Sequence, residues 1–209
     1  MSDVPSALLP VLQHDVLRVQ QVKEWGEILT GFEGSNRYRI SATDATPLLL
    51  AGEVSRGVLG LLMRWFLKAS RPFTMELREP SGALALRLDR PWRWWFSRLE
   101  VQDAHGHAVG AVQRRFQWFG KRYEVQDARG AVKATIHGPL FKPWTFIVRQ
   151  GDDEVGRIQK RWSGFGKELF TDADSFGVAF DPRLRDLQLR QLLLAATFLI
   201  DFVHFENKG

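Results

Sequence analysis

The chain has 209 residues, of which 44% are apolar, and it contains no cysteine. This composition supports a hydrophobic core, and the lack of cysteine excludes disulfides, thiol catalysis, cysteine-ligated zinc and S-palmitoylation. The formal net charge of +5 favours anionic partners such as lipid headgroups or nucleic acid, although many ordinary soluble proteins are equally basic.

The N-terminal segment begins MSDVPSALLPVLQHD. Because no basic region is followed by a long apolar run, a secretory signal peptide is not expected, and we expect a cytoplasmic protein. We assign residues 1–20 to an N-terminal extension and residues 21–206 to a single domain.

The middle of the chain repeats with a period near 24 residues. Copies read MELREPSG, LEVQDAHG and YEVQDARG, with a weaker copy IVRQGDD, and Gly82, Gly106 and Gly130 are each 24 residues apart. Each copy alternates apolar and polar residues, reaches a glycine turn and alternates again, which is typical of a β-hairpin. At least four hairpins give eight or more antiparallel strands, and a sheet of this length tends to curl and close.

The connections between hairpins are expected at the opposite end of the sheet from the glycine turns. They read VLGLLMRWFLK, PWRWWF, FQWFGK, LFKPW and SGFGK, and they hold six of the eight tryptophans together with several cations. Tryptophan beside lysine and arginine suits the interface of an anionic membrane. The alternative is that the rings plug the end of a barrel and pack on a helix. The membrane-contact candidates are Trp65, Trp92, Arg93, Trp94, Trp95, Trp118, Lys121, Lys142 and Trp144.

The last part of the chain predicts an apolar helix at about residues 182–205, with Asp181 as N-cap and Pro182 at the first helical position. The uncharged stretch between Arg190 and Asp201 has only ten residues, whereas a membrane span needs about 20. We therefore favour a helix buried in protein over a membrane anchor, and a mainly β fold with a closed barrel around it over a sandwich with the helix outside. Asp201 then needs a buried partner, and we expect an arginine or a tryptophan N–H of the barrel wall rather than Arg190.

The segments WSGFGKELFTDADSFGVAF and ATFLIDFVHFE resemble the C-terminal part of the phospholipid scramblases, and LTGFEGSNRYRI, AGEVS, RPF, DRP and HGP follow the family's order upstream. The resemblance covers residues 11–206. It implies a tubby-like fold, a closed barrel of about twelve strands around a hydrophobic C-terminal helix, and calcium-dependent, non-specific movement of phospholipids between leaflets. Eukaryotic members carry lipidated cysteine-rich loops; we hypothesise that the aromatic loops replace them here.

The family's proposed calcium loop corresponds to residues 172–183, DADSFGVAFDPR. Asp172 and Asp174 match the first and third positions of an EF-hand loop, and Asp181 is a further candidate ligand. However, Phe176 stands at the fifth position, and Arg183 replaces the usual bidentate carboxylate at the twelfth. We therefore favour a β-turn in this segment over a site that binds calcium at micromolar concentrations. We retain Asp172, Asp174 and Asp181 as candidate ligands of a weak calcium site.

The sequence shows no nucleophile elbow, phosphate-binding loop or metal-binding helix motif, so we expect no enzyme. The first hypothesis is a scramblase-like protein, peripherally associated with anionic phospholipid membranes, that binds and moves phospholipid. The alternative is a soluble barrel that serves as a phosphoinositide- or protein-binding scaffold. Nucleic acid is disfavoured as a partner, because lysine and arginine are interleaved with acidic residues rather than gathered in one stripe.

Overall fold

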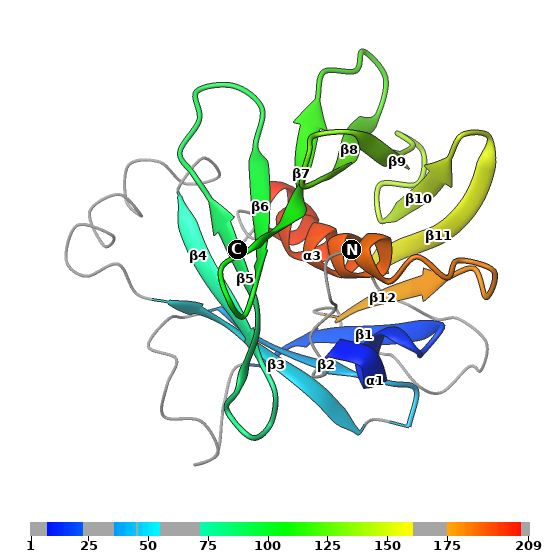
Figure 1. Ribbon diagram of the computed structural model, residues 1–209. Helices are drawn as coiled ribbons and strands as arrows, with labels where there is room; N and C mark the ends of the chain where they lie inside the picture. Colours follow the sequence, from blue (N-terminus) through cyan, green and yellow to red (C-terminus); the bar gives the residue numbers. More distant parts are fainter. Residues whose placement is uncertain (1–7, 23–35, 45, 55–71, 161–174, 206–209) are drawn as a thin grey trace.

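The computed structural model describes residues 8–22, 36–44, 46–54, 72–160 and 175–205. In these parts of the chain, twelve antiparallel strands close into one barrel, and Figure 1 shows the barrel wrapped around the long helix α3. Consecutive strands are neighbours throughout, and β1 pairs with β12 to close the ring. The elements are α1 (Leu9–Leu12), β1 (Val16–Gln21), β2 (Arg37–Ser41), β3 (Pro47–Val54), β4 (Phe73–Arg78), β5 (Leu84–Arg90), β6 (Arg98–Asp103), β7 (Ala108–Arg115), β8 (Lys121–Asp127), β9 (Val132–Gly138), β10 (Thr145–Gln150), β11 (Asp153–Lys160), β12 (Ser175–Phe180) and α3 (Leu187–His204).

The repeated hairpins form because their sequence satisfies both the strand and the turn. In β6, alternate residues face the core and the solvent. The carboxylate of Asp103 then accepts hydrogen bonds of 2.9 Å from the backbone N–H groups of His105 and His107, and Gly106 adopts a φ of 83°. Asp127 makes the same turn 24 residues later, which explains why the repeat conserves the spacing of Asp and Gly within this chain.

Helix α3 is enclosed by protein. Every residue from Leu189 to Phe202 is buried, so the helix has no polar face to turn to solvent. By length and composition, α3 is the one helix among the described residues that could cross a membrane, with a mean hydropathy of 1.2, but 78% of that window is buried inside the protein. The predicted barrel around a buried C-terminal helix is confirmed, and the sandwich arrangement is wrong.

The start of α3 differs from the prediction. The helix begins at Leu187, and the side chain of Asp186 is its N-cap, accepting a 3.0 Å hydrogen bond from the N–H of Leu189. Asp181, expected to be the cap, instead closes a turn: its carbonyl accepts from the N–H of Leu184 at 2.8 Å, and its carboxylate accepts from the N–H of Arg183. Residues that suit a helix follow both aspartates. Because of the turn at Asp181, however, the helix begins five residues later than predicted.

The barrel also begins earlier than residue 21. Strand β1 lies between β12 and β2, although its residues fall in the stretch assigned to an N-terminal extension. Leu17 and Val19 point into the core, while Arg18 points outward, so this strand follows the same alternation as the hairpins. Leu8 and Leu12 are fully buried as well. The barrel cannot close without β1, which explains why this segment belongs to the fold.

The two ends of the barrel are distinct. The N-terminal end of α3 lies beside the glycine turns, where Asp186 forms an ion pair with Lys133. The C-terminal end lies beside the longer loops, where Trp144 packs on Phe205 with ring centroids 6.4 Å apart. In Figure 1, the loops joining β5 to β6 and β7 to β8 project from one end, and the β4–β5 turn projects from the other.

Candidate functional site

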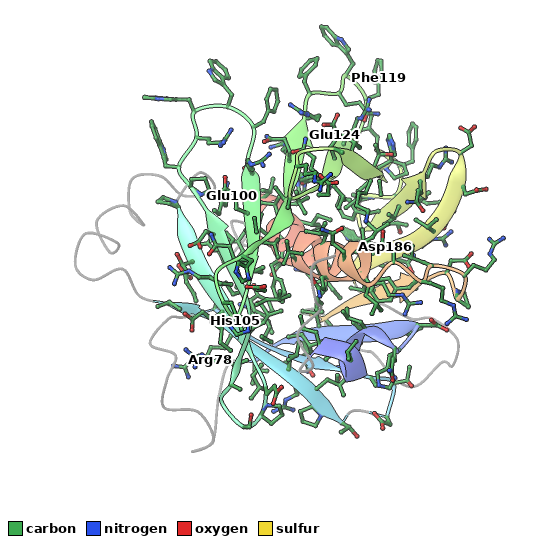
Figure 2. All side chains as sticks on the ribbon, in the orientation of Figure 1. Arg78, Glu100, His105, Phe119, Glu124 and Asp186 are labelled. Carbon is green, nitrogen blue, oxygen red and sulfur yellow. The ribbon has the colours of Figure 1, made fainter. Side chains whose placement is uncertain are left out.

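The most unusual surface of the barrel is formed by the β5–β6, β7–β8 and β9–β10 loops. They carry all the exposed large apolar side chains among the described residues except Leu9 and Val132. Figure 2 shows Phe119 projecting from this end, far from His105 at a glycine turn. Exposed apolar side chains gathered at one end of a domain mark an interaction site. We call it the aromatic crown; its members are Trp92, Trp94, Trp95, Phe96, Phe116, Trp118, Phe119, Leu140 and Phe141.

The tips of the crown face away from the core. Trp94, Trp95 and Trp118 are 80–84% exposed, and Phe141 is 97% exposed. Some rings contact each other within a loop, as do Trp92 and Trp94 with centroids 4.5 Å apart, but these contacts leave most of their surface in water. The predicted alternative, in which these rings plug the barrel, is therefore wrong for the tips.

Cations lie among and directly beneath the crown. Residues 91–98, 114–123 and 138–147 contain no aspartate or glutamate, but they contain Arg93, Arg98, Arg114, Arg115, Lys121, Arg122 and Lys142. At the opposite end, the four glycine turns contain or directly follow Glu79, Asp103, Asp127 and Asp152. The barrel is thus cationic and aromatic at one end and richer in acidic groups at the other.

Two of the predicted contact residues are turned toward the end of α3 instead of the solvent. Trp144 is half-buried against Phe205. The Lys121 ammonium donates to the Pro143 carbonyl at 3.2 Å and lies 5.5 Å from the centroid of the Phe205 ring. For these two residues the plug interpretation is correct, because both fill the mouth of the barrel around the helix. Arg93 and Lys142 are exposed, and Trp65 lies outside the described residues.

A buried polar network lies below this mouth. Asp201 on α3 accepts a 2.7 Å hydrogen bond from the Tyr38 hydroxyl and lies 3.3 Å from the Lys160 ammonium. Among the described residues, its partners are thus Tyr38 and Lys160, whereas the sequence had predicted an arginine or a tryptophan of the barrel wall. Nearby, Tyr123 Oη is 2.6 Å from His204 Nε2, and burial raises the pKa of Tyr123, so its hydroxyl stays protonated.

The calcium candidates are only partly described. Asp172 and Asp174 lie outside the described residues, whereas Asp181 forms an ion pair with the Arg183 guanidinium at 2.8 Å. The hydrogen bonds from the Arg183 side chain and backbone lower the pKa of Asp181 to about 2. The middle of the proposed loop, Ser175–Phe180, forms strand β12. Within the described parts of the chain, no three His, Asp or Glu side chains are grouped to hold a metal ion. Calcium binding stays a prediction.

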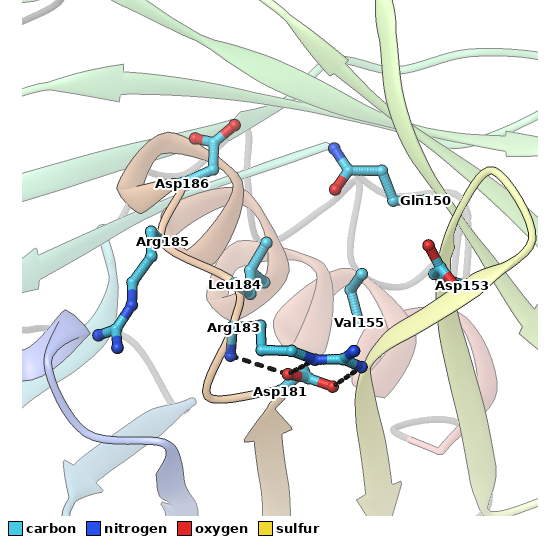
Figure 3. A pocket seen from close by; sticks show the side chains of 8 residues that line it. All are labelled: Gln150, Asp153, Val155, Asp181, Arg183, Leu184, Arg185 and Asp186. Carbon is cyan, nitrogen blue, oxygen red and sulfur yellow. Dashed lines mark hydrogen bonds and ion pairs between the residues drawn. The ribbon is translucent and has the colours of Figure 1, made fainter.

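A pocket of about 270 Å³ lies at the opposite end from the crown, between the β10–β11 turn and the segment before α3. Figure 3 shows the Asp181–Arg183 pair on its wall, with Asp153 and Asp186 at other sides. Its side chains carry both signs of charge, and Asp186 is committed to capping α3 and to Lys133. The lining of this pocket therefore favours neither an anionic nor a cationic ligand.

Sequence reasoning quoted the loops of the crown but did not single out five of its members. These are Phe96, Phe116, Phe119, Leu140 and Phe141. The sequence could have identified these five residues as exposed, because an apolar side chain in a loop bounded by glycine or proline does not lie on the buried face of a strand. The partners of Asp201 carried no such signal, since Tyr38 and Lys160 are far away in sequence.

Comparisons with known proteins agree with these features. A family model described as Scramblase matches residues 1–207. The chain is 32% identical to phospholipid scramblase 1 of Rattus norvegicus, over 99% of this chain and 64% of that protein. It is 33% identical to phospholipid scramblase 2 of Bos taurus, over 97% of this chain and 72% of that protein. The chain thus spans about two thirds of the length of these relatives. No solved structure matches it significantly. This chain belongs to the scramblase family.

Proposed function

We propose that the protein docks on anionic phospholipid membranes through the aromatic crown and that it binds phospholipid and moves it between the two leaflets. The observation that carries the docking is the gathering of exposed rings, arginines and lysines at one end of the barrel. The lipid movement rests on membership of the scramblase family. No chemical step is required, so the protein is proposed to be a lipid-binding protein and not an enzyme.

The crown has the two components of an interfacial anchor. Tryptophan and phenylalanine rings settle at headgroup depth, and burying one such side chain completely contributes about 1.5–3 kcal/mol. Each lysine or arginine near an anionic surface adds about 1 kcal/mol at moderate salt. Since the acidic groups gather at the opposite end, the barrel is expected to stand with its crown against the membrane and its glycine turns away from it.

The buried position of α3 favours peripheral association over a membrane span. The helix fills the centre of the barrel, so we place the bound phospholipid at the crown and outside the strands. Calcium, if it acts, would act through a weak site of Asp172, Asp174 and Asp181, and Asp181 would first have to leave Arg183.

Flotation with liposomes tests the docking. Purified protein is mixed with neutral or anionic vesicles, with and without calcium, and the bound fraction is measured. The expected result is binding to anionic vesicles that is lost when Trp94→Ser, Trp95→Ser and Trp118→Ser are combined, with the thermal midpoint unchanged. Val132→Ser, an exposed apolar residue away from the crown, is the matched control. Unchanged binding of the triple variant would refute the crown as the docking surface.

Transbilayer movement is tested separately. The protein is added to vesicles that carry a fluorescent phospholipid, and the fraction of the dye reached by a membrane-impermeant reductant is followed. We expect this fraction to rise above one leaflet's share for the wild type and not for the triple variant. If the protein binds vesicles but does not move lipid, it is a membrane-binding protein without scramblase activity. If it neither binds vesicles nor moves lipid, the result favours the soluble scaffold. An increase in the reduced fraction of the dye when calcium is added would support the calcium site that includes Asp172.

A further inference from the structure

We infer that the outer face of β8, β9 and β10 binds the phosphomonoester headgroup of a membrane lipid through Arg122, His137 and Arg149. The delivery of the lipid to this face rests on the proposed function. The recognition itself rests on the three side chains and on the positions that the strand register gives them.

The register brings the three residues together on one face. Arg122 on β8 is the direct cross-strand partner of His137 on β9. Arg149 on β10 is paired with Thr135, which lies two residues from His137 on the same face. Directly opposed side chains have Cβ atoms about 5 Å apart, and diagonal neighbours are about 7–8 Å apart. The intervening residues point inward and are buried, so this trio faces outward.

The two guanidinium groups are not balanced by acidic groups. Within the described parts of the chain, neither Arg122 nor Arg149 has an ion-pair or hydrogen-bond partner, and the Nε of Arg122 is buried without an acceptor. The nearby acidic residues are already bound by other arginines: Glu124 by Arg115 at 2.9 Å, and Glu154, the cross-strand partner of Arg149 on β11, by Arg157 at 2.7 Å. A buried N–H without an acceptor costs free energy, and like charges that share one face of a sheet repel. An anion on this face removes both costs.

The electrostatics of His137 support the same placement. The pKa of His137 is lowered by burial first and then by the positive charges of Arg122 and Arg149. The Nε2 atom also lies 3.0 Å from the Thr135 hydroxyl. A phosphate between the cations would oppose their effect and favour the charged imidazolium. The charged groups around this position are Arg122 and Glu124 of β8, Arg149 of β10, and Glu154 and Arg157 on the next strand, β11.

A phosphomonoester fits better than a diester. Its charge near neutral pH is about −1.5 to −2, and it presents three acceptor oxygens to the donors of two guanidinium groups and one imidazole. His137 precedes the crown residue Phe141 by four positions, so a rise of about 3.3 Å per residue places it at most about 13 Å from that residue. Arg149 is level with Thr135 and lies two residues farther from the crown. The trio can meet the headgroups of the leaflet when the crown inserts and the membrane surface reaches the barrel wall.

Vesicle binding tests the inference with the full chain. Wild type is titrated with phosphatidylcholine vesicles that contain phosphatidic acid, a phosphomonoester, or phosphatidylglycerol, a diester, at matched surface charge. We expect tighter binding to phosphatidic acid, and we expect combined Arg122→Gln and Arg149→Gln to weaken that binding by at least about tenfold. Arg129→Gln, which removes a charge from an exposed turn at the other end, should not change the preference. Equal binding to the two anionic lipids would overturn the inference.

A soluble probe separates this site from docking. Glycerol 3-phosphate is added to protein with isotope-labelled histidine, and the His137 ring resonances are followed by NMR over a pH series. A rise in the pKa of His137 that is lost in the double arginine variant supports the site, even if no vesicle binds and the docking proposal falls. No response of His137 overturns the site, even if the crown docks on vesicles. A response to inorganic phosphate equal to that to glycerol 3-phosphate supports recognition of the phosphate group itself.

Discussion

Asp201 and Tyr38 are joined by a 2.7 Å hydrogen bond from the tyrosine hydroxyl to the carboxylate, across 163 positions of sequence. The same carboxylate lies 3.3 Å from the Lys160 ammonium. One acidic side chain on α3 therefore connects the helix to β2 and to β11. These two strands are separated around the barrel by β1 and β12, so the connection spans the site at which the barrel closes.

Replacing Asp201 is expected to be costly. Asp201→Ala leaves the Lys160 charge and the Tyr38 hydroxyl in a site where the carboxylate is 8% exposed, and it should lower the free energy of unfolding by about 3–5 kcal/mol. Asp201→Asn keeps an acceptor for Tyr38 and should cost less. Urea denaturation measures both, with Asp152→Ala in an exposed turn as the control. A loss below about 1 kcal/mol for Asp201→Ala would show that the network relaxes or admits water.

Arg190 links the start of α3 to the N-terminal segment. Its guanidinium is 3% exposed, and it donates to the carbonyls of Leu184 and Leu12 and to the carboxylate of Asp15, at 2.7–2.9 Å. Arg190→Met should lower the free energy of unfolding by about 3 kcal/mol or more, because buried carbonyls lose their donors. Arg190→Lys should rescue little, since one ammonium cannot reach the same fork of acceptors. Arg185→Met, at an exposed neighbouring site, should be nearly neutral.

The Asp181–Arg183 pair should respond to acid. Because the pKa of Asp181 is about 2 in the folded protein and its ordinary value is 3.8, the pair contributes stability above pH 3.8 and loses it as the pH falls toward 2. Arg183→Ala removes the largest cause of the shift and should raise the pKa of Asp181 toward 3.8. An NMR titration of the Asp181 carboxyl measures this directly. A pKa that stays near 2 in the variant would assign the shift to the backbone hydrogen bond.

The same variant tests the calcium site. Arg183→Ala frees the Asp181 carboxylate, so if Asp181 acts with Asp172 and Asp174, the variant should bind calcium more tightly than the wild type. Calorimetry measures the heats, with Asp172→Ala added to the Arg183→Ala background as the control. Identical heats in all three proteins would remove these residues from any calcium role.

The absence of cysteine allows a clean test of orientation. A polarity-sensitive dye is attached to Phe141→Cys in the crown or to Arg129→Cys in a turn at the other end, and anionic vesicles are added. The dye at position 141 should shift to the blue and be quenched by lipids labelled in the acyl chain, whereas the dye at position 129 should not change. Equal quenching at both positions would contradict an upright barrel.

Much of the barrel followed from the sequence because its determinants are local. The alternation within each hairpin and the Asp–Gly spacing of the turns act over fewer than ten residues, so they can be read in order along the chain. The start of α3 was wrong because two aspartates compete as caps, and the choice depends on the turn at Asp181. Strand β1 was missed because it stands apart from the repeat and is recruited by pairing with β12.

The candidate site was predicted in outline only. The β5–β6, β7–β8 and β9–β10 loops were correctly placed at one end, since turns in a meander alternate, whereas the other two predicted loops lie outside the described residues. Sequence could not tell that Trp144 and Lys121 turn inward while Trp118 points outward, because loop conformation and the position of Phe205 decide this. The trio of Arg122, His137 and Arg149 depends on the register of three strands. A shift of one residue would send Arg122 to the opposite face of the sheet.

The pairing of β1 with β12 sets the order in which this protein can be made. Arg18 lies opposite Gly177, and the helix that fills the barrel follows still later. As the chain leaves the ribosome, the early strands have neither their closing partner nor the apolar core around which they wrap. Contacts over such separations form slowly. We therefore expect the barrel to assemble in one late event after α3 has emerged, with the unclosed strands depending until then on chaperones to prevent aggregation.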